Sequence, residues 1–325
     1  MRTESCSVGL WPARAFEKRG SALLTVLWLT AALSAIGIAV AARVRGETER
    51  TATSMDDVKA YFAARGAIER TAMRFYWGND FYVFGTPAVD VALPEAQVHV
   101  DIIPETSKLD VNNILPETLL RLLAALGVAP AAAEELTAAI IDWRTPVSPD
   151  RPSVFDAYYL SQTPSFSARH TSFQQNEELL LIKGMTNDLY YGDSLNGSRP
   201  GLRECLSIYG ANSFVDINTA QPAAMIALGL SPEDAAAVVL RRSQHPILDS
   251  REFSEIQQAL GPAGQHLAMG GTSLFTLRAT ARLRTPDGKL SDMRRTVGAL
   301  VKLHFQGNKQ KMPSGFEVIN WYDRP

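Results

Sequence analysis

The chain has 325 residues, 46% of them hydrophobic and 20% charged, and a formal net charge of −2. These values describe an ordinary folded protein with room for two or three domains, and the nearly balanced charge selects no class of partner. Its two cysteines, Cys6 and Cys205, lie on opposite sides of a long apolar run, so a fold held together by a disulfide framework is excluded.

The first predicted element is a membrane helix over residues 21–42. This run carries no charged residue, and as a helix rising ~1.5 Å per residue it matches the thickness of a bilayer core. Two alternatives are a secretory signal peptide cleaved at Ala39-Val40-Ala41 and a buried helix of a soluble domain. A retained membrane helix fits best, because the run exceeds the ~7–15 apolar residues usual in signal peptides and is longer than globular cores normally supply.

Residues 1–20 are predicted to be a leader, because they are polar and show no periodicity that would bury a face. Arg19-Gly20 directly precedes the apolar helix that begins at Ser21. A basic residue followed by glycine at the start of such a helix is typical of a prepilin peptidase cleavage site. Basic residues stand on both sides of the apolar run, so charge alone does not orient it in a membrane.

Residues 43–78 are predicted to continue this helix as a stem, because the segment contains no proline. One apolar stripe among charged residues is expected to be buried. Its members are Val44, Val58, Phe62, Ile68 and Met73. An aromatic cluster follows and is expected to pack where the stem meets a sheet. It consists of Phe75, Tyr76, Trp77, Phe81, Tyr82 and Phe84.

Two parts of the chain show the alternation of apolar and polar residues that is typical of half-buried strands. The first lies in residues 79–106, around Gln97 to Ile102. The second lies in residues 266–325, where alternating runs on both sides of Pro286-Asp287-Gly288 predict a β-hairpin. These two parts are expected to form one β-containing domain that is interrupted by the residues between them.

The segment between them contains an internal repeat. Leu109 to Asn113, Pro116 and an apolar helix ending near Val128 correspond to Val215 to Thr219, Pro222 and a helix ending near Leu230. A second, alanine-rich helix follows in each copy, and Gly127 or Gly229 is expected at the turn between the two helices. In each copy the asparagine, Asn112 or Asn218, is placed to cap the next helix. The pattern predicts two helix-hairpin-helix units, one within residues 107–204 and one within 205–265.

Helix-hairpin-helix units can bind phosphates through backbone N–H groups, so a nucleic-acid partner has to be considered. Residues 107–265 contain 18 acidic and 11 basic residues, an acidic excess of seven. Phosphate binding draws most of its affinity from cationic side chains. The sequence therefore predicts that these repeats do not bind nucleic acid.

Asp142, Asp150 and Asp156 flank a proline-rich loop and are the candidate metal ligands. Calcium accepts carboxylates and carbonyls from irregular loops, so these residues are candidate calcium ligands, although the spacing is not that of an EF-hand. The favoured interpretation is that they are ordinary solvated acids. The sequence contains none of the common catalytic motifs and its five histidines are scattered, so no enzyme activity is expected.

In order and spacing, these features resemble the minor pseudopilin K family of bacterial type II secretion over nearly the whole chain after residue 18. The residues that carry the resemblance are Arg19-Gly20, the two repeat openings at Asp110 and Asp216, Ile140-Ile141-Asp142-Trp143, Tyr158-Tyr159-Leu160 and Ile182-Lys183-Gly184-Met185.

The resemblance implies an α+β, pilin-like fold: a long N-terminal helix packed on an antiparallel sheet, with a large α-helical domain inserted. It also implies cleavage between Gly20 and Ser21, methylation of the new amine, a single inner-membrane span with a cytoplasmic N-terminus, and a periplasmic body. The implied partners are the minor pseudopilins H, I and J, prepilin peptidase, the inner-membrane secretion platform and secreted proteins.

One position bears on the place of such a subunit in a filament. Most pseudopilins carry glutamate at the fifth mature position, where its carboxylate neutralises the N-terminal amine of a neighbour inside the apolar filament core. Here that position is Thr25. The sequence thus predicts a non-enzymatic subunit that caps the pseudopilus tip. The alternatives are a membrane-tethered DNA-binding protein of competence or pilus machinery and an exported enzyme.

Overall fold

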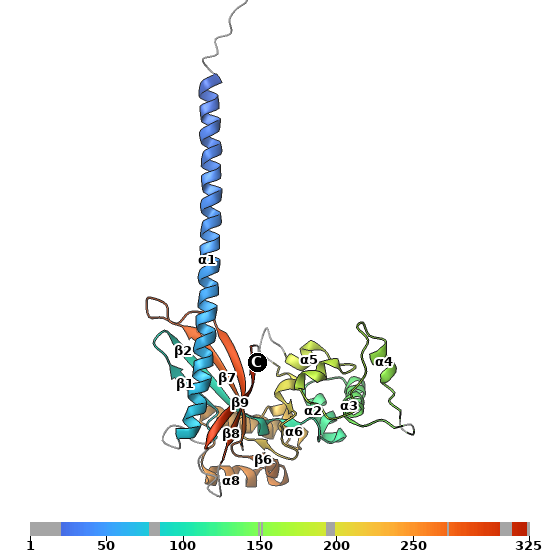
Figure 1. Cartoon of the computed structure of the whole chain (residues 1–325). Coiled ribbons are helices and arrows are strands. Elements are labelled where there is room, and N and C mark those ends of the chain that lie inside the picture. Colours follow the sequence, from blue (N-terminus) through green and yellow to red (C-terminus); the bar gives the residue numbers. More distant parts are fainter. Residues whose placement is uncertain are drawn as a thin grey trace, which may run out of the picture. The chain divides into compact units, whose positions relative to one another are not determined.

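The structure is a computed structural model of the whole chain (Figure 1) and describes residues 21–77, 85–148, 150, 152–192, 199–271, 273–305 and 314–323. The chain divides into two compact units, Met1–Val58 and Lys59–Pro325. The predicted leader, with Cys6 and Gly20, lies outside the described residues, and so do Phe81, Tyr82 and Phe84 of the predicted aromatic cluster.

A single helix, α1 (Ser21–Trp77), covers the predicted membrane segment and stem without a break, as expected for a run that lacks proline. In the first unit its side chains are almost entirely exposed. Among the described residues, α1 is the one helix that is long and apolar enough to cross a membrane, and none of its most apolar window is buried. The alternative of a core helix therefore has no support in the structure.

Within the second unit, the end of α1 packs on a sheet through small side chains. The buried apolar residues are Ala60, Ala64, Ala67, Ile68, Ala72 and Phe75. The predicted apolar stripe was wrong apart from Ile68, because Val44, Val58, Phe62 and Met73 are exposed. Alanines at these spacings let the helix backbone approach the strands closely, so the larger side chains lie on the other face of the helix.

The sheet of the second unit has five antiparallel strands in the order β1-β2-β7-β8-β9. Their bounds are β1 (Ala88–Ala92), β2 (Ala96–Pro104), β7 (Leu274–Leu283), β8 (Arg295–His304) and β9 (Gly315–Tyr322). Strands β7 and β8 form the hairpin predicted on both sides of Pro286-Asp287-Gly288. Strand β2 pairs with β7, from Ala96 opposite Leu283 to Pro104 opposite Phe275. Two strands that are far apart in the sequence are therefore neighbours in the sheet.

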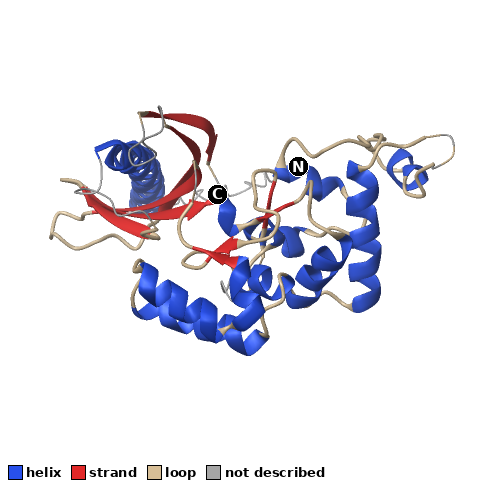
Figure 2. Ribbon diagram, turned by 90° about the horizontal axis from the view of Figure 1, so that it is seen from below, coloured by secondary structure: helices blue, strands red, loops and turns tan. Residues whose placement is uncertain are grey.

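One face of this sheet and the end of α1 enclose a hydrophobic core. Alternate residues of the strands point into it, as in the pairing of buried Val98 with Ala281 and of Val100 with Ala279. Phe75 of α1 stacks on Phe275 of β7 with ring centroids 5.2 Å apart. Figure 2 shows this part of α1 end-on beside the strands.

The residues between β2 and β7 form the inserted helical region. Its α-helices are α2 (Pro116–Ala125), α3 (Pro130–Arg144), α4 (Asp156–Leu160), α5 (Asn187–Tyr191), α6 (Pro222–Ala227), α7 (Pro232–Gln244) and α8 (Ser250–Ala259). Its 3-10 helices are η1 (Glu105–Ser107), η2 (Asn176–Leu181), η3 (Leu202–Glu204) and η4 (Gly261–His266). Its short strands form two parallel pairs, β3 (Leu109–Asp110) with β4 (Leu206–Ser207) and β5 (Val215–Asp216) with β6 (Leu267–Ala268).

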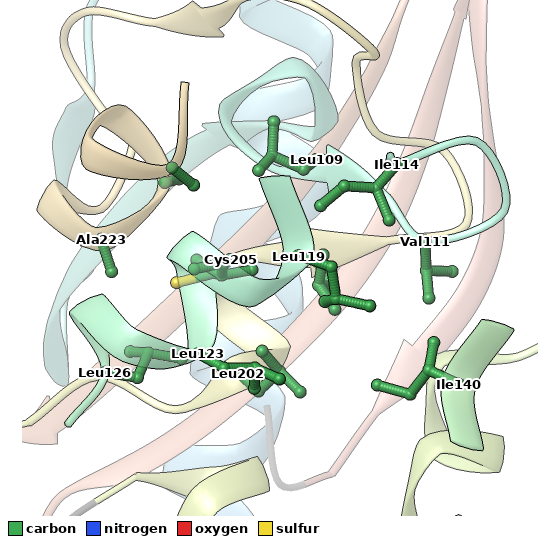
Figure 3. Packing of buried hydrophobic residues seen from close by; sticks show 14 of the residues in the cluster. Leu109, Val111, Ile114, Leu119, Leu123, Leu126, Ile140, Leu202, Cys205 and Ala223 are labelled. Atoms are coloured by element: carbon green, nitrogen blue, oxygen red, sulfur yellow. The ribbon is translucent and has the colours of Figure 1, made fainter. Parts of the chain in front are cut away.

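One hydrophobic core runs through both predicted halves of this insert. Helix α2 of the first repeat packs on α6 of the second, and Arg121 donates from Nε to the carbonyl of Ala227 over 2.8 Å. Figure 3 shows side chains of both repeats around Cys205, with Leu119 on one side and Ala223 on the other. Burial raises the pKa of the Cys205 thiol to about 12, so this cysteine is an inert core residue.

Candidate functional site

The N-terminal part of α1 holds the residues predicted to matter for maturation and assembly. Ser21 is the first residue of the helix, and Gly20 lies outside the described residues. Thr25 is exposed and its hydroxyl donates to the carbonyl of Ala22 over 2.8 Å. This position therefore presents no charge, and its hydroxyl is satisfied by the helix that carries it.

Of the three aspartates predicted as metal ligands, two meet around a histidine. His170 Nε2 lies 2.9 Å from Oδ1 of Asp156, and its Nδ1 lies 3.3 Å from the carbonyl oxygen of Asp142. Asp142 also accepts a 2.6 Å hydrogen bond from Ser153 Oγ. Asp150 is exposed. His170 was not singled out by the sequence, because only the fold of the loop after α3 places it between these carboxylates.

The His170 ring is nearly buried and carries an altered pKa. Burial opposes protonation, but the hydrogen bond to Asp156, the contact with the Asp142 carbonyl and the two negative charges outweigh it and raise the pKa of His170. The protonated ring then lies where it neutralises both carboxylates. Positive backbone φ at His170, 49°, is part of the sharp turn that brings the ring there.

The arrangement around His170 differs from what calcium requires. Calcium takes six to eight oxygen ligands. Among the residues that the structure describes, no three His, Cys, Asp or Glu side chains gather in a way that would hold a metal ion. As placed, the side chains of Asp142, Asp150 and Asp156 do not fit a calcium ion, since an imidazole occupies the position between two of them.

The motif that opens each repeat, Asp-x-Asn, folds in the same way twice. The carboxylate of Asp110 accepts from the backbone N–H of Asn112 over 2.8 Å, and that of Asp216 accepts from Asn218 over 3.1 Å. Each aspartate thus closes a tight turn after its two-residue strand. The first helix of each repeat begins only after this turn, at a residue whose side chain makes no capping hydrogen bond.

The predicted role of the asparagines as helix caps was therefore wrong. Asn112 accepts from the N–H of Phe173 and donates to its carbonyl, over 2.7 and 3.1 Å. Asn218 makes the same pair of bonds with Ile247, both 2.8 Å. Each amide pairs with the backbone of a distant segment as a neighbouring strand would, which local sequence spacing does not reveal.

An arginine at the end of the second helix completes each unit. Arg144 donates from Nη1 to the carbonyl of Val111 over 2.5 Å, and Arg242 donates to the carbonyl of Ile217 over 2.8 Å. Burial lowers the pKa of both guanidinium groups, and the nearby Asp110 and Asp216 oppose that change. Both arginine side chains therefore hydrogen-bond within their own repeats.

The turns between the two helices have the predicted glycines, and acidic residues follow both of them. Gly127 and Gly229 have φ of 81° and 112°, the left-handed conformation that favours glycine. The first turn of the following helix carries Glu233 and Asp234 in one repeat, and Glu134 and Glu135 lie near the start of α3 in the other. This acidity opposes phosphate binding at either turn.

Comparison with known proteins finds similarity to one family. A family model described as "Type II secretion system (T2SS), protein K" matches residues 102–192. Type II secretion system protein K of Klebsiella pneumoniae is 27% identical over 258 residues, which cover 70% of this chain and 74% of that protein. The chain resembles the protein K family of type II secretion. Members of this family are minor pseudopilins, structural subunits that are not known as enzymes.

A solved structure of this family has the same fold. The crystal structure of the GspK-GspI-GspJ complex from enterotoxigenic Escherichia coli contains a chain that matches with a TM-score of 0.51 and 16% identity. The match covers 84% of this chain and 98% of that one. The architecture of a long helix on a five-stranded sheet with an inserted helical region is therefore that of protein K.

In this chain, a buried glutamate joins the insert to the sheet, and sequence reasoning missed it. Glu105 follows β2, is 2% exposed, and accepts from the hydroxyls of Thr276 on β7 and Ser207 on β4. Lys108 Nζ lies 3.2 Å from its Oε1. Burial opposes ionisation, but the Lys108 charge and the hydrogen bonds outweigh it and lower the pKa of Glu105. The carboxylate ties three segments together.

Proposed function

We propose that this chain caps the tip of a type II secretion pseudopilus as a non-enzymatic subunit, aiding assembly of the pseudopilus and protein export across the outer membrane. The observation that carries the proposal is the uninterrupted α1, which begins at Ser21 with an exposed apolar half and ends packed on a sheet. An exposed apolar helix of this length requires a membrane or neighbouring apolar helices around it.

The place at the tip follows from the fifth position after Gly20. Thr25 offers a hydroxyl already bonded to Ala22, so it supplies no carboxylate to a neighbour's N-terminal amine. A buried ammonium without a partner is costly, so a further subunit above this one would be disfavoured. The inserted region, which we propose contains two helix-hairpin-helix units, adds bulk that obstructs stacking on the same side.

The proposed partners are the minor pseudopilins H, I and J, together with prepilin peptidase, the inner-membrane platform and secreted proteins. The Escherichia coli protein was crystallised as a GspK-GspI-GspJ complex, which supports I and J among these. The proposed location is the inner membrane, with one span, a cytoplasmic N-terminus and a periplasmic body. Nucleic-acid binding is not proposed, because acidic residues stand beside both glycine turns.

Intact mass of the mature protein tests maturation. Co-expression with prepilin peptidase should yield a chain that begins at Ser21 with one methyl group on its amine. A matched Gly20→Glu variant should keep its leader, because the peptidase site is lost. A mature N-terminus near Ala42 would instead indicate a removed signal peptide and would overturn the proposal.

The tip position is tested by Thr25→Glu with Thr30→Glu as its control. Thr30 is also exposed on α1 and also bonds the carbonyl three residues earlier, Leu27, over 3.0 Å. Cross-linked pseudopili should contain the wild-type subunit only at one end. Thr25→Glu should also place it within the filament, because the new carboxylate can pair with an amine, whereas Thr30→Glu should not. Equal behaviour of both variants would contradict the charge argument.

A further inference from the structure

A cleft of about 580 Å³ lies in the second unit between the inserted region and the sheet. Its floor includes Thr276 and Arg278 of β7, which lie on the sheet face opposite α1. One wall is the end of β9, with Asn320 and Tyr322, and the other is formed by η2, α5 and the segment around Tyr209. None of the assembly features described above involves this cleft.

Large side chains are exposed around the cleft. Tyr191, Tyr209 and Ile319 are 42%, 41% and 42% exposed, and all three line it. Tyr191 packs edge-on against the buried Tyr190, with ring centroids 4.8 Å apart, and the Arg203 guanidinium lies 5.0 Å from the Tyr191 ring centroid. Tyrosine and arginine held in this way are the residues that dominate binding energy at protein interfaces.

The strong charges on the floor of the cleft are matched within the protein. Arg278 lies 3.1 Å from Oδ2 of Asp101 and 3.4 Å from Oε1 of Glu204, and Lys108 is paired with Glu105. An anion would have to compete with these carboxylates. Amide side chains that both donate and accept, such as Gln175 and Asn320, also line the walls, which suits a ligand with alternating donors and acceptors.

Strand β9 is an edge strand of the sheet. In the described part of the structure it pairs with β8 alone, so alternate backbone N–H and C=O groups along its other side are free to bind a further strand. β9 contains no proline, and Glu317 is its one charged residue. The register shift between Leu300 and Val301 of β8 makes Ile319 the bulged residue of β9, beside the cleft.

We propose that this cleft binds an extended segment of another polypeptide, which adds to β9 as a sixth strand and places alternate side chains among Tyr191, Tyr209 and Tyr322. The backbone of such a segment supplies the alternating donors and acceptors that the strand edge and the amide side chains require. Its side chains on the cleft side cover the exposed rings. This binding site goes beyond the assembly role, because it needs neither the membrane helix nor Thr25.

The test pans the full chain, held in detergent, against a phage library of random peptides about as long as a strand. We expect enriched peptides with apolar residues at alternate positions and micromolar affinity. Hydrogen exchange of the β9 amides that face away from β8 should slow when a synthetic copy of an enriched peptide is added. Ile319→Lys and Tyr209→Ala should each weaken binding about tenfold or more.

Leu240→Lys is the control, because Leu240 is 64% exposed on α7 and does not line the cleft. It should bind the peptides as wild type does, and all three variants should keep the wild-type thermal midpoint. Three results would each overturn the proposal: no enriched peptide, slowed exchange elsewhere than β9, or protection in the free protein of the β9 amides that face away from β8. Displacement of the peptides by N-acetylglucosamine oligomers would assign the cleft to a saccharide and would also overturn it.

Discussion

The two repeats of the inserted region make the same local contacts but bind different distant segments of the chain. In both, an aspartate closes a turn, an asparagine pairs with a distant backbone segment, and an arginine binds the carbonyl between them. The first repeat holds the segment at Phe173, which follows the loop carrying His170. The second holds Ile247 and also reaches the sheet domain, since Asn218 donates to the carbonyl of Gly85 over 3.3 Å.

The surroundings of the two motifs differ accordingly. Asp216 and Asn218 are 1% and 6% exposed, whereas Asn112 is only partly buried. Ser107, just after β2, also bonds Thr219 of the second motif over 2.5 Å. The same short sequence pattern therefore binds a segment within the insert in one copy. In the other copy it forms a joint, that is, a contact between the insert and the sheet domain.

The largest effect is expected from Asn218→Ala, which breaks the joint. The change leaves the N–H and carbonyl of Ile247 and the carbonyl of Gly85 without their partner in a buried site. We expect a loss of about 3–5 kcal/mol in the free energy of unfolding, since each buried group left unpaired costs about 1–3 kcal/mol. Urea denaturation measures it, and a loss below that of Asn112→Ala would refute the assignment of the joint.

The same change in the first repeat, Asn112→Ala, should cost less, about 1–3 kcal/mol, because two backbone groups rather than three lose a partner and water reaches the site more easily. Hydrogen exchange should become faster around Phe173 and stay unchanged around Ile247. Equal acceleration in both segments would mean that the repeats unfold as one unit.

Substitution of the turn glycines should lower the free energy of unfolding by the same amount in the two repeats. A Cβ at Gly127 or Gly229 would meet no atom within 4 Å, so only the left-handed backbone opposes a side chain. Gly127→Ala and Gly229→Ala should each lower the free energy of unfolding by about 1–2 kcal/mol. A clearly larger loss at either turn, measured in urea, would reveal a contact of that turn which the structure does not contain.

The smallest effect is expected from pH at His170, a feature of the first repeat alone. Its pKa is raised by folding, so its contribution to stability is complete below the ordinary histidine pKa of about 6.5 and is lost as pH rises through the raised value. His170→Asn, which tolerates the positive φ, should flatten the dependence of the thermal midpoint on pH in that range.

The calcium prediction can be tested by thermal unfolding of the wild-type protein and of the Asp142→Asn variant. If the protonated ring of His170 neutralises Asp142 and Asp156, millimolar calcium should leave the thermal midpoint of the wild-type protein unchanged. A clear rise in that midpoint, abolished by Asp142→Asn, would restore the predicted calcium site.

Several features were predictable because they depend on local chemistry. An uncharged run of 22 residues and a proline-free stem specify one long helix. Alternation on both sides of Pro286-Asp287-Gly288 specifies the β7–β8 hairpin, and Gly127 and Gly229 specify the left-handed turns. The repeat itself was visible, since both copies carry the same residues at the same spacing.

Other features were decided by contacts between residues far apart in the chain. The sequence contains the alanines of α1, but only packing on the sheet makes them, rather than Phe62 and Met73, the buried face. Asn112 and Asn218 looked like helix caps because local spacing allowed it, and their distant backbone partners exist only in the folded insert. Glu105, His170 and the cleft beside β9 likewise depend on long-range placement, because burial and pairing of a polar group are properties of its surroundings and not of its neighbours in sequence.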